Sequence, residues 1–429
     1  MPRRYPLSKR LSWRIEYAGY RTMEALLRLV TLPLIDRAGS VLGAGLYALS
    51  PHYRRLAIRN LRLAFGGEMT LPEIRTLARR TCQRTIANFL GTLKTTVLPT
   101  RAVSRQVSFS GLEKLEAALA QGRGAVLVLG HMGNWEILNR LHHFLPPGTP
   151  AGGIYQPLKN PLVNALLLRR REQDGSRMFS KKGGFHGPAG FVKSGGLLIV
   201  VADQKTGRAG TALPFFNRLS SLSPLPALLA RKAGAPVLAA GIETTRAGHW
   251  RVVFQPLPEK PRPEEILSAL ETLIRRSPAD YLWLHDRWRL SSRRPLSLRT
   301  KKRSSRAFPD TLPLRVLLLA REEPDHETLD DFLAQRAEGD LPLSFETLAS
   351  PHHADSDDDT WVSATPEQLT ALINRLDQEK SHPLEAVLVL SDDKLLQQAA
   401  QASRVPAIHR NGQNLPLRDF LAKLSAPSD

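Results

Sequence analysis

A histidine and a glutamate stand five positions apart in the stretch VLVLGHMGNWEILNR, residues 126–140. On a continuous helix His131 and Glu136 would lie about 140° apart and would face different directions. They can meet if His131 lies in a strand-to-helix turn and Glu136 lies in the first turn of the helix. Gly130 and Gly133 allow such a tight turn, and the helix dipole favours a glutamate at that place.

A histidine–glutamate pair supports general-base activation of a hydroxyl group. A neutral imidazole takes the proton, while the carboxylate fixes the tautomer and stabilises the imidazolium. The chain has no G-x-S-x-G elbow and its one cysteine, Cys82, lies elsewhere in the sequence, so we expect the acceptor hydroxyl to attack directly. The H-x4-E spacing is common by chance, and only its strand and glycine context favours a catalytic pair.

The residues around this pair alternate between strand and helix patterns. Short β-type runs occupy residues 124–130, 195–204, 235–243 and 249–257, and a helical pattern covers 223–234. The first three runs are almost continuously apolar, as in strands buried on both faces. The pattern predicts an α/β core over 101–295, with a central, mostly parallel sheet flanked by helices. Ligands of such sheets bind at the carboxyl ends of the strands, where His131 is expected.

The region 1–100 is predicted to be helical, basic and amphipathic. Helical patterns cover residues 11–65 and 71–97, with Thr70 as a possible N-cap of the second. Trp and Leu side chains alternate with arginines, which is typical of a helix lying in a membrane interface. A helix packed on the domain is the alternative. No secretory signal and no membrane-spanning helix of about 20 apolar residues is predicted.

The C-terminal part is predicted to be a separate unit. Residues 296–310 read as a basic linker, and 311–429 as a small acidic α/β domain of unknown role. Thr365 and Gln368 form a capping-box pattern before a predicted helix. The acidic loop 351–360 can bind a cation through its histidines and aspartates, but a solvated loop is the preferred interpretation. This domain has no phosphate-loop, dinucleotide or metal signature, so we expect it to be noncatalytic.

The charge distribution indicates the kind of partner, and the cysteine content excludes two kinds of site. The net charge is +20, with +28 in residues 1–300 and −8 in residues 301–429. A basic body indicates an acidic partner, such as an anionic membrane, a phosphorylated lipid or nucleic acid, and solubility alone is the alternative. One cysteine excludes an intramolecular disulfide and a multi-cysteine metal site. No nucleic-acid-binding module accompanies the arginine cluster at 169–171.

The segment GHMGNWE, residues 130–136, resembles the signature of the lipid A biosynthesis lauroyl/myristoyl acyltransferases, within the lysophospholipid acyltransferase superfamily. Further blocks resemble that family in the same order. They are YQPLKNPLVN (155–164), RRREQDG (169–175), GGLLIVVADQ (195–204), PFFNR (214–218), LARKAGAPVL (229–238) and PADYLWLHDRWR (278–289). The resemblance covers about residues 11–290, and the order of the blocks makes it far more specific than H-x4-E alone.

The resemblance implies transfer of an acyl chain from acyl carrier protein, or from acyl-CoA, to a lipid hydroxyl. It makes His131 the base and Glu136 its orienting partner. Arg171 is expected to hold a phosphate or the developing oxyanion, with Arg170 as an equally placed alternative. Asp203 and Gln204 either face the active-site cleft that would contain His131 or form a structural turn. The complete set of expected substrate-binding residues is Asn134, Trp135, Tyr155, Arg170, Arg171, Asp203, Gln204 and Arg287, of which Asn134 and Trp135 would also shape the turn.

Three positions depart from the family pattern and leave the acceptor open. Gln156 and Asp286 stand where arginine is common, and Asn217 stands where glycine is usual. We therefore expect an O-acyltransferase for a lipid A precursor at the cytoplasmic face of a bacterial inner membrane, without a cofactor or metal. The alternatives are the same chemistry on a lysophospholipid or glycolipid, and a nonenzymatic basic adaptor on membrane or nucleic acid. Nucleic acid is not an expected partner of the enzyme.

Overall fold

The computed structural model describes most of the 429 residues. The described ranges are 5–66, 68–204, 211–216, 218–285, 287–288, 314–321, 324–335, 343–349, 365–379, 384–403, 405, 407–410 and 416–425. They form two compact units. The first comprises residues 1–57, 75–204 and 222–285, and the second comprises 58–74, 205–221 and 286–429. The expected linker 296–310 and the acidic loop 351–360 lie outside the described residues, and the division of the chain into four segments stays a prediction.

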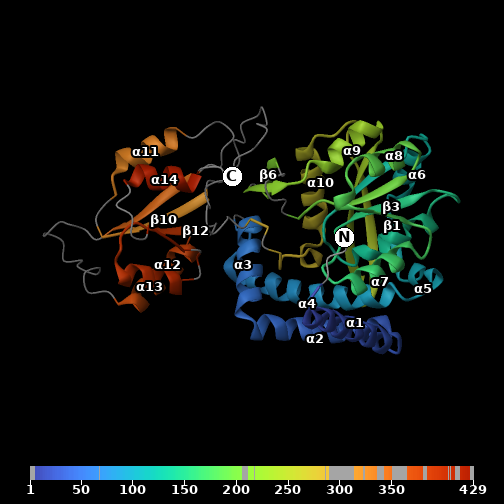
Figure 1. Ribbon diagram of the computed structural model, residues 1–429, viewed down its shortest axis with the longest axis horizontal. Coiled ribbons are helices and arrows are strands. Elements are labelled where there is room, and N and C mark those ends of the chain that lie inside the picture. The colour runs from blue at the N-terminus through green and yellow to red at the C-terminus, as the bar shows by residue number, and fades with distance from the viewer. Residues whose placement is uncertain are drawn as a thin grey trace. The chain divides into compact units, whose positions relative to one another are not determined.

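A seven-stranded sheet forms the centre of the first unit (Figure 1). Its strands, in spatial order, are β1 (Val107–Ser110), β9 (His249–Pro256), β8 (Val237–Arg246), β2 (Ala125–Leu129), β5 (Leu197–Val201), β3 (Ala151–Tyr155) and β4 (Arg177–Ser180). Only β8 and β9 pair antiparallel, and every other neighbouring pair is parallel. The predicted α/β core with a mostly parallel sheet is therefore confirmed.

The apolar strands lie in the middle of this sheet because helices cover them. Every residue of β2 is buried, and its Leu127 and Leu129 share one core cluster with Ile199 of β5 and Leu238 of β8. Such burial on both faces explains the continuous apolar runs of these strands. The helices that follow or precede the strands are α5 (Thr100–Ser104), α6 (Leu112–Leu119), α7 (Pro161–Glu172), α8 (His186–Lys193), α9 (Leu225–Ala233) and α10 (Pro263–Arg276).

The N-terminal region is helical as predicted, and it is divided where the sequence carries proline. The helices are α1 (Leu7–Arg28), α2 (Leu32–Leu49), α3 (Pro51–Phe65) and α4 (Leu71–Thr95). Two glycines let α2 approach α4 closely, since a Cβ at Gly39 would lie 2.5 Å from the Cα of Ala87, and one at Gly43 would lie 2.3 Å from the carbonyl oxygen of Cys82. At the start of α4 the carboxylate of Glu73 accepts a hydrogen bond from the backbone of Thr70.

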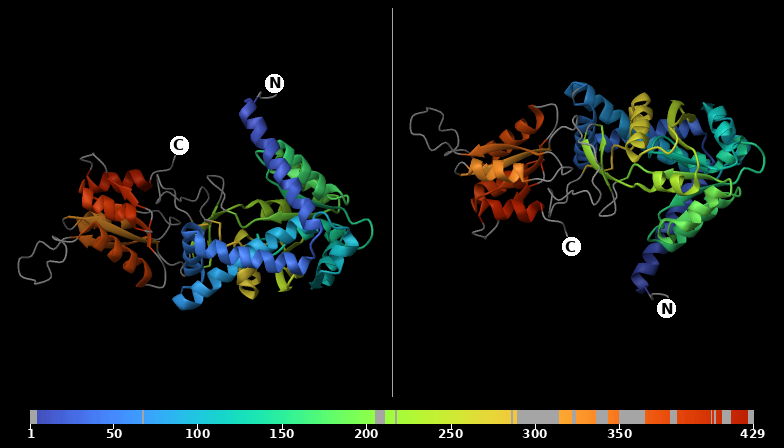
Figure 2. Two further views of the ribbon diagram at one scale, coloured as in Figure 1. Left: turned by 90° about the horizontal axis from the view of Figure 1, so that it is seen from below. Right: turned by 90° about the horizontal axis from the view of Figure 1, so that it is seen from above.

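Helix α1 has two opposite faces. Its inner face carries the buried Trp13, Glu24 and Leu27. At about 100° per residue, the opposite face carries Leu7, Leu11, Ile15 and Leu26, and Leu29 at the C-cap continues it. These five side chains are 57–85% exposed. Figure 2 shows α1 running outward from the rest of its unit toward the N-terminus. None of the described helices is both long enough and apolar enough to cross a bilayer.

The second unit contains its own parallel sheet of four strands, in the order β11-β10-β12-β13. In Figure 1, α11 and α14 lie on one face of this sheet, and α12 and α13 lie on the other. Thr365 and Gln368 exchange the hydrogen bonds of a capping box at the start of α12, as predicted. The elements are β10 (Leu314–Ala320), α11 (His326–Ala334), β11 (Leu343–Ala349), α12 (Pro366–Glu379), β12 (Leu384–Val389), α13 (Lys394–Ala402), β13 (Ala407–His409) and α14 (Leu417–Ser425). The predicted second α/β sheet is therefore present.

Candidate active site

His131 lies in the tight turn between strand β2 and the helix that follows it. This helix, η1 (Trp135–Phe144), is a 3-10 helix, and Glu136 lies in its first turn as predicted. Gly133 has φ +56°, and a Cβ there would lie 2.6 Å from the carbonyl oxygen of Ile242, so only glycine fits without strain. The predicted strand–turn–helix arrangement is thus present, with a tighter helix than expected.

Residues 280–282, near the end of the first unit, hydrogen-bond to the backbone of this turn. The backbone N–H of Gly133 donates to the carbonyl oxygen of Asp280 at 2.9 Å, and the N–H of Leu282 donates to the carbonyl of His131 at 2.9 Å. Met132 and Tyr281 form an isolated antiparallel bridge between these two contacts. The backbone that carries the imidazole is therefore held on both sides.

The carboxylate on the His131 ring is that of Asp203. Its Oδ1 lies 2.6 Å from Nδ1 of His131, and its Oδ2 accepts a 2.9 Å hydrogen bond from the His131 backbone N–H. The Asp203 side chain is 4% exposed and that of His131 is 16% exposed. An ionised carboxylate only accepts hydrogen bonds, so it places the ring proton on Nδ1 and leaves the lone pair on Nε2. The geometry is that of a base oriented by an acid.

Glu136, predicted to orient His131, instead binds an arginine. Its two carboxylate oxygens accept hydrogen bonds from Nε and Nη2 of Arg171, at 3.0 and 2.5 Å, and Asn139 donates to the same carboxylate at 2.7 Å. Burial opposes the charged form of Arg171, but the hydrogen bond and charge of Glu136 outweigh it, so the pKa of Arg171 is raised. The Asp203 carboxylate therefore contacts His131, whereas the Glu136 carboxylate binds Arg171.

Strand register explains why Asp203 reaches the histidine. Leu129 at the end of β2 is paired with Val201 at the end of β5. His131 and Asp203 each stand two positions beyond this pair, so parallel strands bring them to the same edge of the sheet at the same height. The sequence indicates Asp203 and Gln204 as polar residues at the end of the apolar run 195–204, but no local pattern indicates that this strand lies beside β2.

We call the contacting pair His131–Asp203 the dyad. Two of the other predicted site residues lie beside the imidazole of the dyad, and a third lies in the turn that carries it. Nε2 of Gln204 lies 3.2 Å from Nε2 of His131, and the Trp135 ring stands edge-on to the imidazole with centroids 5.0 Å apart. Asn134 is fully buried and bonded to Thr92 and Thr95 of α4. Its observed contacts therefore shape the turn.

The predicted arginines differ in their surroundings. Arg170 pairs with the buried Glu24 of α1, with two nitrogen–oxygen distances of 3.4 Å, whereas Arg171 pairs with Glu136. Tyr155, at the end of β3, contributes to the electrostatic environment of Arg171. Arg287 belongs to the second unit, where its guanidinium is buried and stacks 3.9 Å above the Phe215 ring.

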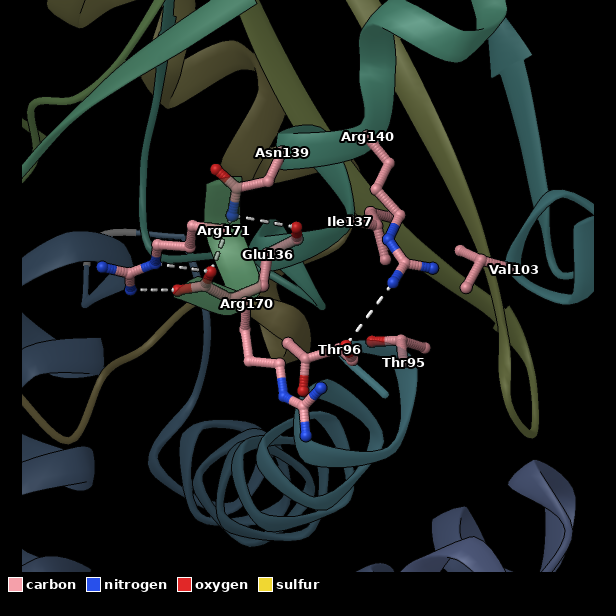
Figure 3. A pocket seen from close by; sticks show the side chains of 9 residues that line it. All are labelled: Thr95, Thr96, Val103, Glu136, Ile137, Asn139, Arg140, Arg170 and Arg171. Carbon is pink, nitrogen blue, oxygen red and sulfur yellow. Dashed lines mark hydrogen bonds and ion pairs between the residues drawn. The ribbon is translucent and has the colours of Figure 1, made fainter. Parts of the chain in front are cut away.

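A small pocket lies beside the Glu136–Arg171 pair (Figure 3). Three arginines from η1 and α7 line it together with Thr95, the last residue of α4, and Thr96, which follows it. The lining residues are Thr95, Thr96, Val103, Glu136, Ile137, Asn139, Arg140, Arg170 and Arg171. Over the described ranges, no group of three or more histidines, cysteines, aspartates or glutamates is arranged to hold a metal ion.

Replacing Asp280 with alanine is expected to lower the free energy of unfolding by about 2–4 kcal/mol. The buried Asp280 carboxylate accepts hydrogen bonds from Asn88, from Ser277 and from the backbone and hydroxyl of Thr244. The substitution removes this acceptor from the buried amide of Asn88 and from the half-buried donors of Thr244 and Ser277. Denaturant unfolding measures the loss, and Glu113→Ala, at an exposed position, should change it by less than about 0.5 kcal/mol. Equal values for the two variants would contradict the prediction.

Comparison with known proteins identifies the family. The profile described as bacterial lipid A biosynthesis acyltransferase matches residues 6–290, a span that contains the dyad, the Glu136–Arg171 pair and the whole central sheet. The chain belongs to this acyltransferase family. The match ends before β10, so the C-terminal sheet lies outside the part shared with the lipid A biosynthesis acyltransferases.

Named relatives of this acyltransferase act on more than one kind of lipid. It is 25% identical over 267 residues to the lipid A biosynthesis lauroyltransferase of Escherichia coli, covering 60% of this chain and 86% of that one. It is 26% identical over 206 residues to the palmitoleoyltransferase of the same organism, covering 44% and 64%. It is 30% identical over 154 residues to the phosphatidylinositol mannoside acyltransferase of Mycobacterium tuberculosis, covering 33% and 47%. The chain is thus a member of an acyltransferase family whose relatives carry different lipid acceptors in their names.

Proposed function

We propose that this protein transfers a fatty acyl chain from an acyl carrier protein thioester to a hydroxyl of a lipid A precursor, with His131 as general base. The observation that carries the proposal is the contact between Nδ1 of His131 and the buried carboxylate of Asp203. It fixes the tautomer in which Nε2 carries the lone pair that can accept a proton. The NH2 group of Gln204 lies 3.2 Å from that nitrogen, and an acceptor hydroxyl would take the place of this amide contact.

The reaction follows from this geometry as a direct transfer. Nε2 of His131 removes the proton of the acceptor hydroxyl as its oxygen attacks the thioester carbonyl and the new C–O bond forms. The Asp203 carboxylate stabilises the resulting imidazolium. Collapse of the tetrahedral intermediate breaks the C–S bond, and the imidazolium returns the proton to the departing thiolate. No covalent acyl-enzyme is required.

Arg171 is the proposed anion-binding group of the site. Glu136 engages Nε and Nη2 of its guanidinium, and this fixes the plane of the group while Nη1 remains for a ligand. Its side chain is 23% exposed, so a phosphate or a developing oxyanion can reach it. A bidentate carboxylate holds an arginine with the geometric precision that such recognition needs.

The basic body supports the proposed partners and location. Residues 1–300 carry a net charge of +28, which would attract both an acidic carrier protein and an anionic lipid at the cytoplasmic face of the inner membrane. A glycolipid acceptor of another class is the second candidate. The 30% identity to a phosphatidylinositol mannoside acyltransferase favours it specifically.

A transfer assay with matched donors and acceptors tests the proposal. The purified full chain is given labelled acyl carrier protein thioesters or acyl-CoA, with vesicles containing either a lipid A precursor or a mannosylated phosphatidylinositol. Mass spectrometry then identifies the acylated lipid. We expect a new ester on the lipid A precursor with the carrier-protein donor. Transfer only to the second acceptor would establish the glycolipid alternative, and failure with every donor and acceptor would refute both.

The outer face of α1 is the proposed membrane-contact surface. It presents Leu7, Leu11, Ile15, Leu26 and Leu29, and the arginines of the same helix supply positive charge beside them. An apolar stripe with a basic flank is suited to an anionic bilayer surface.

Replacing both Leu11 and Ile15 with glutamine is expected to weaken binding to anionic vesicles by about ten-fold or more, because each side chain loses apolar transfer energy. Vesicle sedimentation measures the change. The control pair Leu11→Met and Ile15→Leu keeps the apolar surface and should bind as the original chain does. Unchanged binding of the glutamine variant would place the membrane contact elsewhere.

A further inference from the structure

Helix α1 is fastened to α7 at both ends of α7. Asn160 caps the start of α7, and its side-chain amide also donates to the Trp13 carbonyl at 3.0 Å and to the Glu16 carboxylate at 2.8 Å. Near the other end of α7, Arg170 pairs with Glu24. Figure 2 shows the two helices side by side. The position of α7 therefore depends on the inner face of α1.

Two consecutive arginines of α7 use two different carboxylates. Arg171 binds Glu136, and Arg170 binds Glu24, whose side chain is only 2% exposed. In Figure 3 the Arg171 guanidinium points toward Glu136, whereas that of Arg170 points away from it. Both arginines and Glu136 line the same pocket, and Glu136 is the one carboxylate among its described lining residues, so it is the alternative negative partner for Arg170 there.

The surroundings make this division of partners sensitive to Glu24. Arg170 is 21% exposed and lies against a buried carboxylate, so removal of that carboxylate would leave a largely buried cation without its counter-charge. Burial together with the charges of Glu24 and Glu136 raises the pKa of the nearby Tyr20 to about 12, so Tyr20 stays a neutral phenol. It cannot replace Glu24 as the negative partner.

We propose that Glu24 is a positioning residue of the active site, which keeps Arg170 occupied and thereby reserves Glu136 for Arg171. The inference rests on the proposed function, since the proposed function assigns the Arg171–Glu136 pair a role in binding an anion during catalysis. Its further content is that α1, whose outer face is the proposed membrane contact, is also part of the site through its inner face.

Steady-state kinetics of the full chain in vesicles test this arrangement. Glu24→Gln should lower kcat about ten-fold with KM within about two-fold, because Arg170 then competes for Glu136. Adding Arg170→Gln should restore most of the loss, because the competing cation is gone. Adding Glu24→Gln to Glu136→Gln should cause no further loss. The control Arg169→Gln removes the same charge from an exposed neighbouring position and should leave kcat unchanged.

If Glu24→Gln with Arg170→Gln is as slow as Glu24→Gln alone, the proposal is overturned. Such a result would mean that Glu24→Gln acts through a packing defect, which a second substitution does not repair. A crystal structure of the Glu24→Gln protein tests the positioning role of Glu24 independently of the proposed function, since the structure requires no substrate and no activity. We expect Arg170 on the Glu136 carboxylate in that structure. An unchanged Arg171–Glu136 pair would overturn the inference even if acyl transfer is established, and the absence of acyl transfer would leave this structural readout intact.

Discussion

Replacement of His131 with glutamine is expected to lower the rate of acyl transfer by about three orders of magnitude or more. Glutamine preserves much of the volume and hydrogen-bonding capacity of the imidazole but cannot accept a proton at neutral pH. The acceptor hydroxyl would then attack without a base. The measurement is single-turnover transfer from a labelled thioester to the acceptor lipid, at saturating concentrations of both substrates.

A second histidine provides the control for this variant. His143 belongs to the same helix that follows the turn, its side chain is 37% exposed, and it lies 3.8 Å from Asp174. His143→Gln should therefore retain transfer activity. Comparable thermal unfolding of both variants would show that the fold is kept. Full activity of a folded His131→Gln protein would refute the base role.

Replacement of Asp203 with asparagine is expected to cost about three to four orders of magnitude in kcat, as removal of the orienting charge does in other histidine–aspartate pairs. The amide can present its NH2 group to Nδ1, and this would move the ring proton to Nε2. The imidazole then lacks a lone pair where the acceptor approaches. The neutral amide also no longer stabilises the imidazolium that forms during transfer.

Glu136→Gln is the comparison that assigns the two carboxylates. It keeps an oxygen that can accept from Arg171 and leaves the Asp203–His131 contact untouched, so we expect a loss of only about ten-fold. Both variants are assayed for kcat and KM with the same substrates. A larger loss for Glu136→Gln than for Asp203→Asn would return the orienting role to Glu136.

The sequence predicted the fold class and the strand–turn–helix setting of His131, because buried strands and glycine turns leave local patterns. It also singled out Asp203 and Arg171. It did not predict which carboxylate contacts which partner, since that depends on β5 lying beside β2. No local pattern specifies this strand order, and the register of Leu129 with Val201 exists only in the assembled sheet.

The two arginines of α7 show a second limit of local patterns. Arg170 and Arg171 are equivalent by composition and position, and the sequence left them as alternatives. Helix geometry separates them by about 100°, so each turns to a different neighbour. Glu24 lies 146 positions from Arg170, and its buried pairing had no signal in the motif.

The base and its orienting acid are 72 positions apart in the chain, and their strands are direct neighbours. The intervening residues pass out through β3 to the edge strand β4 and return to β5, and they include α7 and α8. This excursion holds Arg171 and much of the pocket, but β2 and β5 pair without it. If His131 and Asp203 act as proposed, the groups that activate the hydroxyl and the proposed anion-binding Arg171 lie in separable parts of the chain, so the excursion could diverge toward a new acceptor while the His131–Asp203 contact stays constant.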